Sequence, residues 1–336
     1  MGCQAQFISA MKSSSSSLAR FETQIRTLRE QGVPLRKIAE TLNREHGLSV
    51  TYNAVFSFLK TREKAAQAAT LFYEEFPADI RESLIKQFTA LWTHESTAIE
   101  GNTLTLGETV KVLELGLTIS GKSLKDHEEV YGHAKAVELI YDLLKAEKIT
   151  EDDLFNLHRC VMQKSAIDSL RPVGGWKRDY NGTTGVRDGK PVYMEYAKPD
   201  DTPGLMARWI REFNRKLNTA TSPAKAINAY AWTHLSFVRI HPFFDGNGRI
   251  ARLIANLPLL KGGNPPLLIS PHRRAEYIDL LWNYQNAVGV IQRKDQLLPS
   301  HAAIPAFKSF LREEWKESLR LIEEARKLTS SRLPNP

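Results

Sequence analysis

A short segment in the second half of the chain gathers residue types that are used in phosphoryl chemistry. The segment runs from His241 through Asp245 to Arg249, and an apolar helical stripe that contains Arg252 follows it. An imidazole titrates near neutral pH, so His241 could accept a proton from a hydroxyl group. Asp245 offers the hard oxygen ligand that Mg²⁺ prefers beside substrate phosphates. The segment therefore predicts a general base and a metal ligand within one loop.

The same segment also predicts an anion-binding site. Gly246, Asn247 and Gly248 form a turn directly before the helical stripe. Glycines allow close backbone approach, and the exposed N–H groups and dipole of a helix N-terminus favour a phosphate. Arg249 and Arg252 are three residues apart and share one helical face. Together these features favour a site for phosphoryl or nucleotidyl transfer.

The twelve residues HPFFDGNGRIAR, 241–252, resemble the complete signature of the Fic domain family. Members of this family mostly transfer AMP from ATP to a hydroxyl side chain of a target protein, and the resemblance extends over residues 80–320. It implies that His241 deprotonates the target hydroxyl, which attacks the α-phosphate and releases pyrophosphate. Members of the phosphorylating branch that resembles the Doc toxin carry Lys where this chain has Gly248, so the resemblance favours AMP transfer.

The resemblance also implies roles for the other residues of the segment. Asp245 would hold Mg²⁺, and Asn247 with the amides near Gly246 and Gly248 would cradle the phosphates. Arg249 would meet the β-phosphate and Arg252 the γ-phosphate. Tyr277 and Asn283, on the next expected helix, are candidates for lining the adenine and ribose pocket, although core packing is an alternative for Tyr277.

A second motif lies upstream, where Ser96 precedes Glu100 by four residues and Gly and Asn follow. It resembles the inhibitory motif of regulated Fic proteins, in which the glutamate pairs with the second arginine of the signature, here Arg252. We expect a buried, bidentate pair that withdraws Arg252 from the γ-phosphate. The alternative is that Glu100 is an exposed glutamate near the end of a helix.

The chain between these motifs has mostly helical periodicity, with one exception. An Asp188-Gly189 pair, with β-formers on both sides, predicts a two-stranded flap over about 183–195, which Pro191 confines to an edge. By resemblance, the flap would dock an extended segment of the target protein. The expected helices are 80–99, 106–115, 124–147, 151–163, 203–217, 224–240, 247–260, 274–288 and 304–328.

The N-terminal part of the chain has a different pattern. Residues 1–17 form a serine-rich leader, and three short amphipathic segments follow over 18–64, with Ile25, Ile38, Leu42, Val55 and Phe56 among the positions at core-like spacings. The third segment resembles the recognition helix of a helix-turn-helix domain. Residues 1–64 contain ten Lys or Arg against five Glu, so most of the net charge of +8 lies there. DNA contact and a protein-docking accessory bundle both remain open.

The composition excludes several classes of protein. Only Cys3 and Cys160 are present, so no disulfide framework is possible, and no apolar run approaches the roughly 20 residues needed to span a bilayer. We expect a cytoplasmic, all-α protein with a Fic domain over 65–330, an inhibitory helix near 80–100 and no membrane partner, with a homodimer possible. The expected activity is autoinhibited, Mg²⁺-dependent protein adenylyltransfer with ATP as substrate. Alternatives are a DNA-binding regulator with a nucleotide-sensing Fic domain, and removal of AMP from a modified target.

Overall fold

A computed structural model describes residues 18–66, 71–163, 171–187 and 189–332 of the 336-residue chain. The expected leader, residues 1–17, lies outside the described residues. The chain divides into two compact units, Met1–Ala69 and Thr70–Pro336, which are described separately. Across the described residues, no helix is both long enough and apolar enough to cross a membrane.

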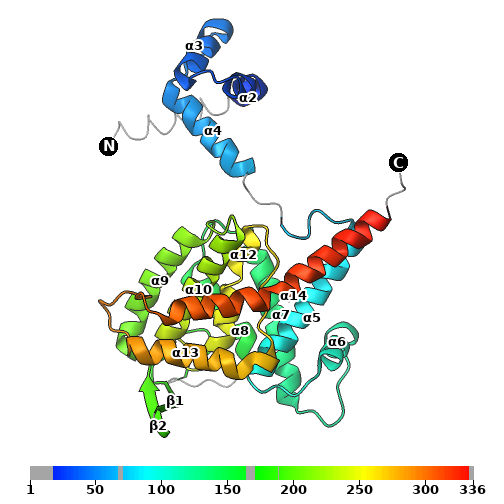
Figure 1. Cartoon of the computed structure of the whole chain (residues 1–336), viewed down its shortest axis with the longest axis vertical. Coiled ribbons are helices and arrows are strands. Elements are labelled where there is room, and N and C mark those ends of the chain that lie inside the picture. Colours follow the sequence, from blue (N-terminus) through cyan, green and yellow to red (C-terminus); the bar gives the residue numbers. More distant parts are fainter. Residues whose placement is uncertain (1–17, 67–70, 164–170, 188, 333–336) are drawn as a thin grey trace. The chain divides into compact units, whose positions relative to one another are not determined.

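Within its described residues, 18–66, the first unit contains a 3₁₀ turn, η1 (Ala19–Phe21), and three α-helices, α2 (Glu22–Glu30), α3 (Leu35–His46) and α4 (Tyr52–Ala66) (Figure 1). Gly47 ends α3 in the left-handed conformation that favours glycine. The expected core position of Phe56 is wrong, because this side chain is 46% exposed and stacks on Tyr52. The buried stripe of α4 instead uses Val55, Phe58 and Leu59, which share a helical face that Phe56 does not reach.

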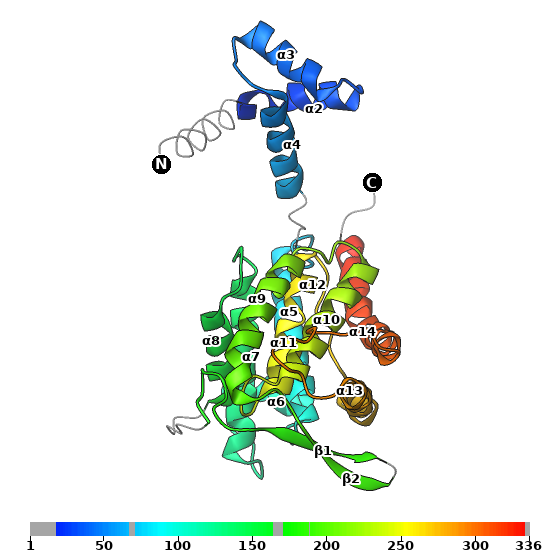
Figure 2. The same cartoon turned by 90° about the vertical axis from the view of Figure 1, so that its left-hand side faces the viewer.

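The second unit is a helical bundle with one small hairpin, which confirms the predicted fold class (Figures 1 and 2). The helix α11 is central and packs against α5, α7, α8 and α10, and α14 covers α10 and α13. The helices of this unit are α5 (Ala78–Ile99), α6 (Leu106–Leu115), α7 (Leu124–Leu143), α8 (Glu151–Met162), α9 (Thr202–Lys216), α10 (Pro223–Ile240), α11 (Asn247–Ile254), α12 (Leu257–Lys261), α13 (Arg274–Val288) and α14 (Ala303–Ser331), with short 3₁₀ turns η2 (Pro199–Asp201) and η3 (Pro271–Arg273).

Side-chain caps explain where several of these helices begin. Thr105, Ser123 and Thr150 each form a complete capping box with an acidic residue three positions later, at the starts of α6, α7 and α8. Ser222 caps α10, and Pro223 occupies its first turn as the sequence predicts. These local contacts fix the starts of α6, α7, α8 and α10.

The expected single helix over 247–260 is wrong, because the structure breaks it into α11 and α12. Pro258 has no N–H group to donate to a carbonyl one turn earlier, so a continuous helix is interrupted before it. The buried Asn256 lies in the break, where its side-chain amide donates to the carbonyls of Arg252 and Leu267 at 3.1 and 2.9 Å. The break therefore anchors the C-terminal end of α11, the helix that carries both arginines.

The expected hairpin is present as β1 (Gly182–Arg187) and β2 (Lys190–Glu195), paired antiparallel from Gly182–Glu195 to Arg187–Lys190. Asp188 lies outside the described residues. The hairpin extends from the helical body, as Figure 2 shows. Gly185 lies so close to Trp282 of α13 that an added Cβ would meet the indole at 2.5 Å. This close approach seats the backbone of the flap on α13.

Candidate functional site

The loop from His241 to Gly246 joins the end of α10 to the start of α11. Two left-handed residues shape the loop: His241 at φ 53° ends α10, and Gly246 at φ 78° precedes α11. A left-handed histidine is uncommon, and such conformations persist where the surroundings hold them. The loop therefore brings the His241 side chain to the N-terminus of α11, as the sequence predicts.

The His241 ring has a defined tautomer. Its Nδ1 lies 3.2 Å from the carbonyl oxygen of Val238, which can only accept a hydrogen bond, so Nδ1 carries the proton. Among the described residues, no hydrogen bond is found for Nε2, so its lone pair is open. Burial, and next the charge of Lys177, lower the pKa of His241 to about 3, so the ring is neutral at pH 7. A neutral imidazole with a free Nε2 is suited to accepting a proton.

Asn247 stabilises the loop through its side chain. Its Oδ1 accepts from the N–H of Phe243 at 2.9 Å, and its Nδ2 donates to the carbonyl of the same residue at 2.7 Å. Since both functions of the amide are engaged, an expected contribution of Asn247 to a phosphate cradle would come from its backbone. The N–H groups of Asn247, Gly248 and Arg249 begin α11, where they have no intrahelical partner.

His158 of α8 supports the same loop from the other side, although the sequence assigns it no role. The N–H of Gly174 donates to Nδ1 at 2.9 Å, and Nε2 therefore donates to the carbonyl of Asp245 at 3.2 Å. The ring also stacks on Phe243, with centroids 3.9 Å apart. Burial lowers the pKa of His158 to about 4. The predicted base is thus held on a loop that a second, neutral histidine supports.

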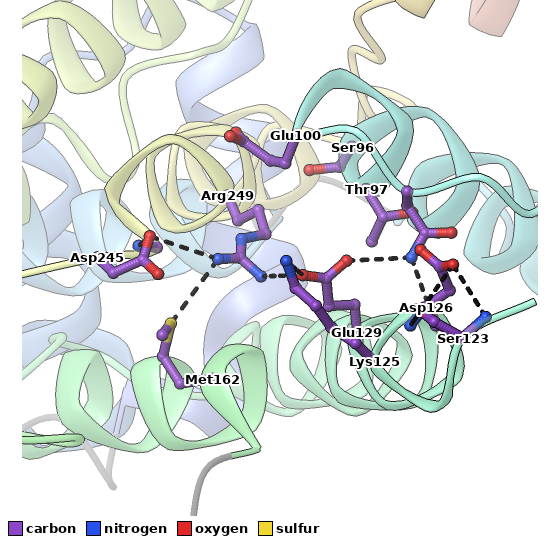
Figure 3. A network of polar contacts seen from close by, with 12 residues as sticks. Ser96, Thr97, Glu100, Ser123, Lys125, Asp126, Glu129, Met162, Asp245 and Arg249 are labelled. Atoms are coloured by element: carbon purple, nitrogen blue, oxygen red, sulfur yellow. Dashed lines mark hydrogen bonds and ion pairs between the residues drawn. The ribbon is translucent and has the colours of Figure 1, made fainter. Parts of the chain in front are cut away.

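Arg249 lies among weak contacts that leave donors available. Its guanidinium is 3.7 Å from Asp245, 3.9 Å from Glu129 and 3.8 Å from the sulfur of Met162. Figure 3 shows these three residues around Arg249. Among the described residues, its buried Nε has no hydrogen-bond partner. An anion at the start of α11 would supply the stronger partner that this arginine lacks.

Arg252, by contrast, is engaged by the upstream motif. Its Nε donates to Ser96 Oγ at 3.0 Å, and its Nη2 donates to the carbonyl of Ser96 at 2.9 Å and to Glu100 Oε1 at 2.6 Å. Burial would raise the pKa of Glu100, but the charge and hydrogen bond of Arg252 outweigh this effect and lower it. The structure thus brings Ser96, Glu100 and Arg252 together, as the sequence predicts.

The geometry of this pair differs from the expected buried, bidentate one. A single carboxylate oxygen, Oε1, is hydrogen-bonded to the guanidinium, and the Glu100 side chain is 37% exposed. Ser96 occupies Nε and shares Nη2, so the Nε edge of the guanidinium is not open to a second carboxylate hydrogen bond. The contact is therefore a hydrogen-bonded ion pair at the edge of the site.

The two residues expected at the adenine and ribose pocket are separated. Tyr277 is buried, and its hydroxyl lies 2.8 Å from His234 Nε2 and 3.4 Å from Arg252 Nη1. This position fits the core-packing alternative, with a polar contact to Arg252 that the sequence does not reveal. Asn283 lies further along α13 and is exposed, and no contact with the 241–252 loop is found for it among the described residues.

The donor set is compatible with Mg²⁺ that enters with a nucleotide. The Asp245 side chain is 57% exposed, and its Oδ1 accepts from the N–H of Gly246 at 2.6 Å. Within the described ranges, no cluster of three or more His, Cys, Asp or Glu could hold a metal alone. One accessible carboxylate beside an anion site suits Mg²⁺, which is usually bound through one or two carboxylates and substrate phosphates.

Glu129 of α7 is a site residue that sequence reasoning missed. Its carboxylate accepts from Asn102 Nδ2 at 3.1 Å and faces Arg249, so it links the residue two positions after Glu100 to the first arginine (Figure 3). The capping box of α7 gives a signal for the helix, but no spacing in the sequence indicates that this face meets Arg249. Both arginines are thus reached from the segment 96–102.

The fold and the site define an α-helical domain in which a neutral histidine and a helix N-terminus lie on one loop. Residues 148–259 match the Fic/DOC family, and over this region the match confirms the resemblance seen in the sequence. The chain is 34% identical over 190 residues to Protein adenylyltransferase Fic of Drosophila persimilis, across 56% of this chain and 34% of that one. It is 37% identical over 192 residues to Protein adenylyltransferase fic-1 of Caenorhabditis briggsae, across 56% and 35%.

Solved structures agree with this assignment. A Fic domain containing signaling protein from Bacteroides thetaiotaomicron is similar with a TM-score of 0.66 and 28% identity, over 76% of this chain and 93% of that one. A variant fragment of Fic-1 from C. elegans is similar with a TM-score of 0.55 and 25% identity, over 94% and 92%. The matched region spans about a third of the length of the two curated relatives.

Proposed function

We propose that this protein is a protein adenylyltransferase that transfers AMP from ATP to a hydroxyl side chain of a target protein or of itself. The observation that carries the proposal is the neutral His241, whose Nε2 is free while its Nδ1 donates to Val238, on a loop that ends in the open N–H groups of α11. The names of the relatives of this Fic domain support the same activity.

The residues suggest how the chain would act on its substrates. His241 Nε2 takes the proton of the target hydroxyl, whose oxygen attacks the α-phosphate of ATP, and pyrophosphate leaves. The N–H groups at the start of α11 and the Arg249 guanidinium bind the phosphates. Asp245 would hold Mg²⁺, which would neutralise charge on the phosphates when it is bound. Cytoplasmic location remains a prediction from the low cysteine content.

We further propose that Ser96 and Glu100 inhibit this activity. Their contacts occupy Nε and Nη2 of Arg252, the arginine that would bind the γ-phosphate. ATP can reach that arginine only when the carboxylate moves away. Removing the carboxylate should therefore increase activity, whereas a merely structural glutamate would give no gain when lost.

The test is transfer of label from α-labelled ATP with Mg²⁺. The Glu100→Gly variant is expected to label itself or a target protein strongly, and the Glu100→Gly, His241→Ala double variant is not. The matched control is γ-labelled ATP, from which no label is transferred because pyrophosphate leaves. Equal labelling by the single and double variants, or transfer of the γ-label, would overturn the assignment.

The flap and the N-terminal unit are proposed as partner sites. Both strands of the two-stranded hairpin are edge strands, so the flap at 183–195 offers main-chain groups to an extended target segment. Residues 18–64 would bind DNA, with α4 and its exposed Tyr52–Phe56 stack in the recognition position. A gel-shift assay at several salt concentrations, with DNA from upstream of the gene for this protein, tests the second role. Absence of binding at low salt would exclude it.

A further inference from the structure

Tyr196 forms a close contact with the predicted base that the sequence motifs do not include. It directly follows β2, and its ring lies parallel to the His241 imidazole, with centroids 3.7 Å apart and an angle of 2° between the planes. Tyr196 is 8% exposed, so most of its surface is taken up by this and other contacts. The base of the flap therefore reaches the residue that would carry out proton transfer.

The hairpin itself holds Tyr196 in place. The N–H of Tyr196 donates to the carbonyl of Asn181 at 3.1 Å, which closes the hairpin just before β1 and just after β2. Burial raises the pKa of Tyr196 to about 12, against the opposing effect of a hydrogen bond with Thr183 of β1. The phenol is thus protonated at neutral pH, and the contact with His241 is one between two neutral rings.

The same end of the hairpin also holds the backbone of the catalytic loop. Asn181 Nδ2 donates to the carbonyl of Phe243 at 2.7 Å, and the N–H of Lys177 donates to the carbonyl of Pro242 at 2.9 Å. The buried Lys177 side chain donates to Asn181 Oδ1 at 2.6 Å and lies 3.4 Å from the carbonyl of Ile240. Residues 240–243 and the base of the flap are therefore one connected unit.

The His241 ring needs a second restraint. Its hydrogen bond to Val238 is long at 3.2 Å and fixes one atom of the ring, which leaves the tilt of the ring plane open. A flat aromatic contact restrains that tilt without covering the ring edge, where Nε2 lies. The stacking thus restrains the tilt of the ring plane and keeps Nε2 accessible.

We propose that Tyr196 is a positioning residue that holds the imidazole of His241 in the orientation required for proton transfer and ties it to the flap. This inference rests on the proposed adenylyltransferase function. A target segment paired with the flap would then sit at a fixed offset from His241 Nε2. Misplacing a reacting group by about 1 Å can cost roughly a hundredfold in rate.

The experiment uses the full chain with Glu100→Gly as the parent. Tyr196→Ala is expected to lower kcat for AMP transfer roughly tenfold to a hundredfold with little change in KM for ATP. Tyr196→Phe keeps the ring and should restore most of the lost rate. Tyr180→Ala is the matched control, because Tyr180 is an exposed tyrosine of the same region. A loss with Tyr196→Phe as large as with Tyr196→Ala would overturn the proposal, since the hydroxyl would then be the essential group.

A second measurement does not depend on activity. The measurement is the NMR chemical shift of the His241 ring protons in the protein with Glu100 intact. The ring current of Tyr196 should move these signals upfield, and Tyr196→Ala should remove this upfield shift and raise the pKa of His241 toward its ordinary value. Tyr196→Phe should keep the upfield position. Unmoved His241 signals in Tyr196→Ala would refute the stacking. A parent that transfers no AMP would refute the proposed function instead, and the two failures are thereby distinguished.

Discussion

Gly248 lies where any side chain would meet the proposed inhibitory carboxylate. A Cβ added at this position would be 2.7 Å from Glu100 Oε1 and 3.1 Å from Arg252 Nη1. The first distance is too short for a carbon and an oxygen, so one atom must move. The carboxylate is the end of a flexible side chain that is 37% exposed, so it moves more easily than the backbone of α11. Gly248→Ala should therefore displace Glu100 from Arg252.

The size of the effect follows from the single contact that is lost. A hydrogen bond to a charged group contributes about 1.5–3 kcal/mol when it is well buried. Because the Glu100 side chain is 37% exposed, solvent screening reduces the contribution to about 1 kcal/mol. Since about 1.4 kcal/mol corresponds to tenfold, we expect roughly fivefold relief of inhibition.

The assay is a double-mutant cycle on the rate of AMP transfer. Gly248 also belongs to the proposed phosphate cradle, so Gly248→Ala can weaken nucleotide binding directly. The Glu100→Gly background measures that direct cost, because no carboxylate remains to be displaced. The ratio of the rates with and without Gly248→Ala is expected to be roughly fivefold higher when Glu100 is present than when it is absent.

Two outcomes would refute this reasoning. Equal ratios in the two backgrounds would show that Gly248 does not act on Glu100. A lower ratio with Glu100 present would show that the added methyl group tightens the inhibitory pair. Thermal unfolding of each variant is the control, because a destabilised α11 would lower the rates in both backgrounds.

Two further predictions concern stability and pH. Burial lowers the pKa of His158 to about 4 and that of His234 to about 3, below the ordinary value near 6.5. Below pH 6.5 the unfolded chain therefore binds more protons than the folded one, and we expect the Tm to drop as the pH falls. A calorimetric pH series measures this, and an unchanged Tm at pH 5 would contradict it. Burial raises the pKa of Glu95 to about 8 from an ordinary 4.5, so its contribution to stability should fall as the pH rises between these values. Glu95→Gln should remove this contribution, and an unchanged pH dependence in that variant would assign it to other groups.

Periodicity and turn residues in the sequence predicted the bounds of several elements well. The bounds of α6 and α13 coincide with the expected ranges 106–115 and 274–288, and the flap strands lie on either side of the predicted turn. Of the two errors, one has a longer-range cause and the other a local one. Phe56 has helical spacing but lies outside the stripe that the first unit buries, and the apolar stripe of 247–260 continues across a proline that breaks its backbone.

The residues of the site fall into two groups: those in one contiguous motif and those that only packing brings to the loop. His241, Asp245 and the two arginines lie within twelve residues, so one contiguous pattern places them on a loop and the helix after it. Glu129, His158 and Tyr196 come from three other elements, and only the packing of α7, α8 and the flap brings them to the loop. The resemblance to the inhibitory motif also predicts that Glu100 meets Arg252, but it does not reveal that Ser96 takes the Nε edge of the guanidinium.

The order of the two motifs along the chain has a consequence for biosynthesis. Ser96 and Glu100 precede Arg252 by 156 and 152 residues. At a synthesis rate of about 5–20 residues per second, the helix that carries Ser96 and Glu100 leaves the ribosome about 8 to 30 s before the arginine that it contacts. Under the proposed function, each new molecule would complete the loop at 241–246 with the proposed inhibitory helix already made, so that no interval of uninhibited AMP transfer would follow translation.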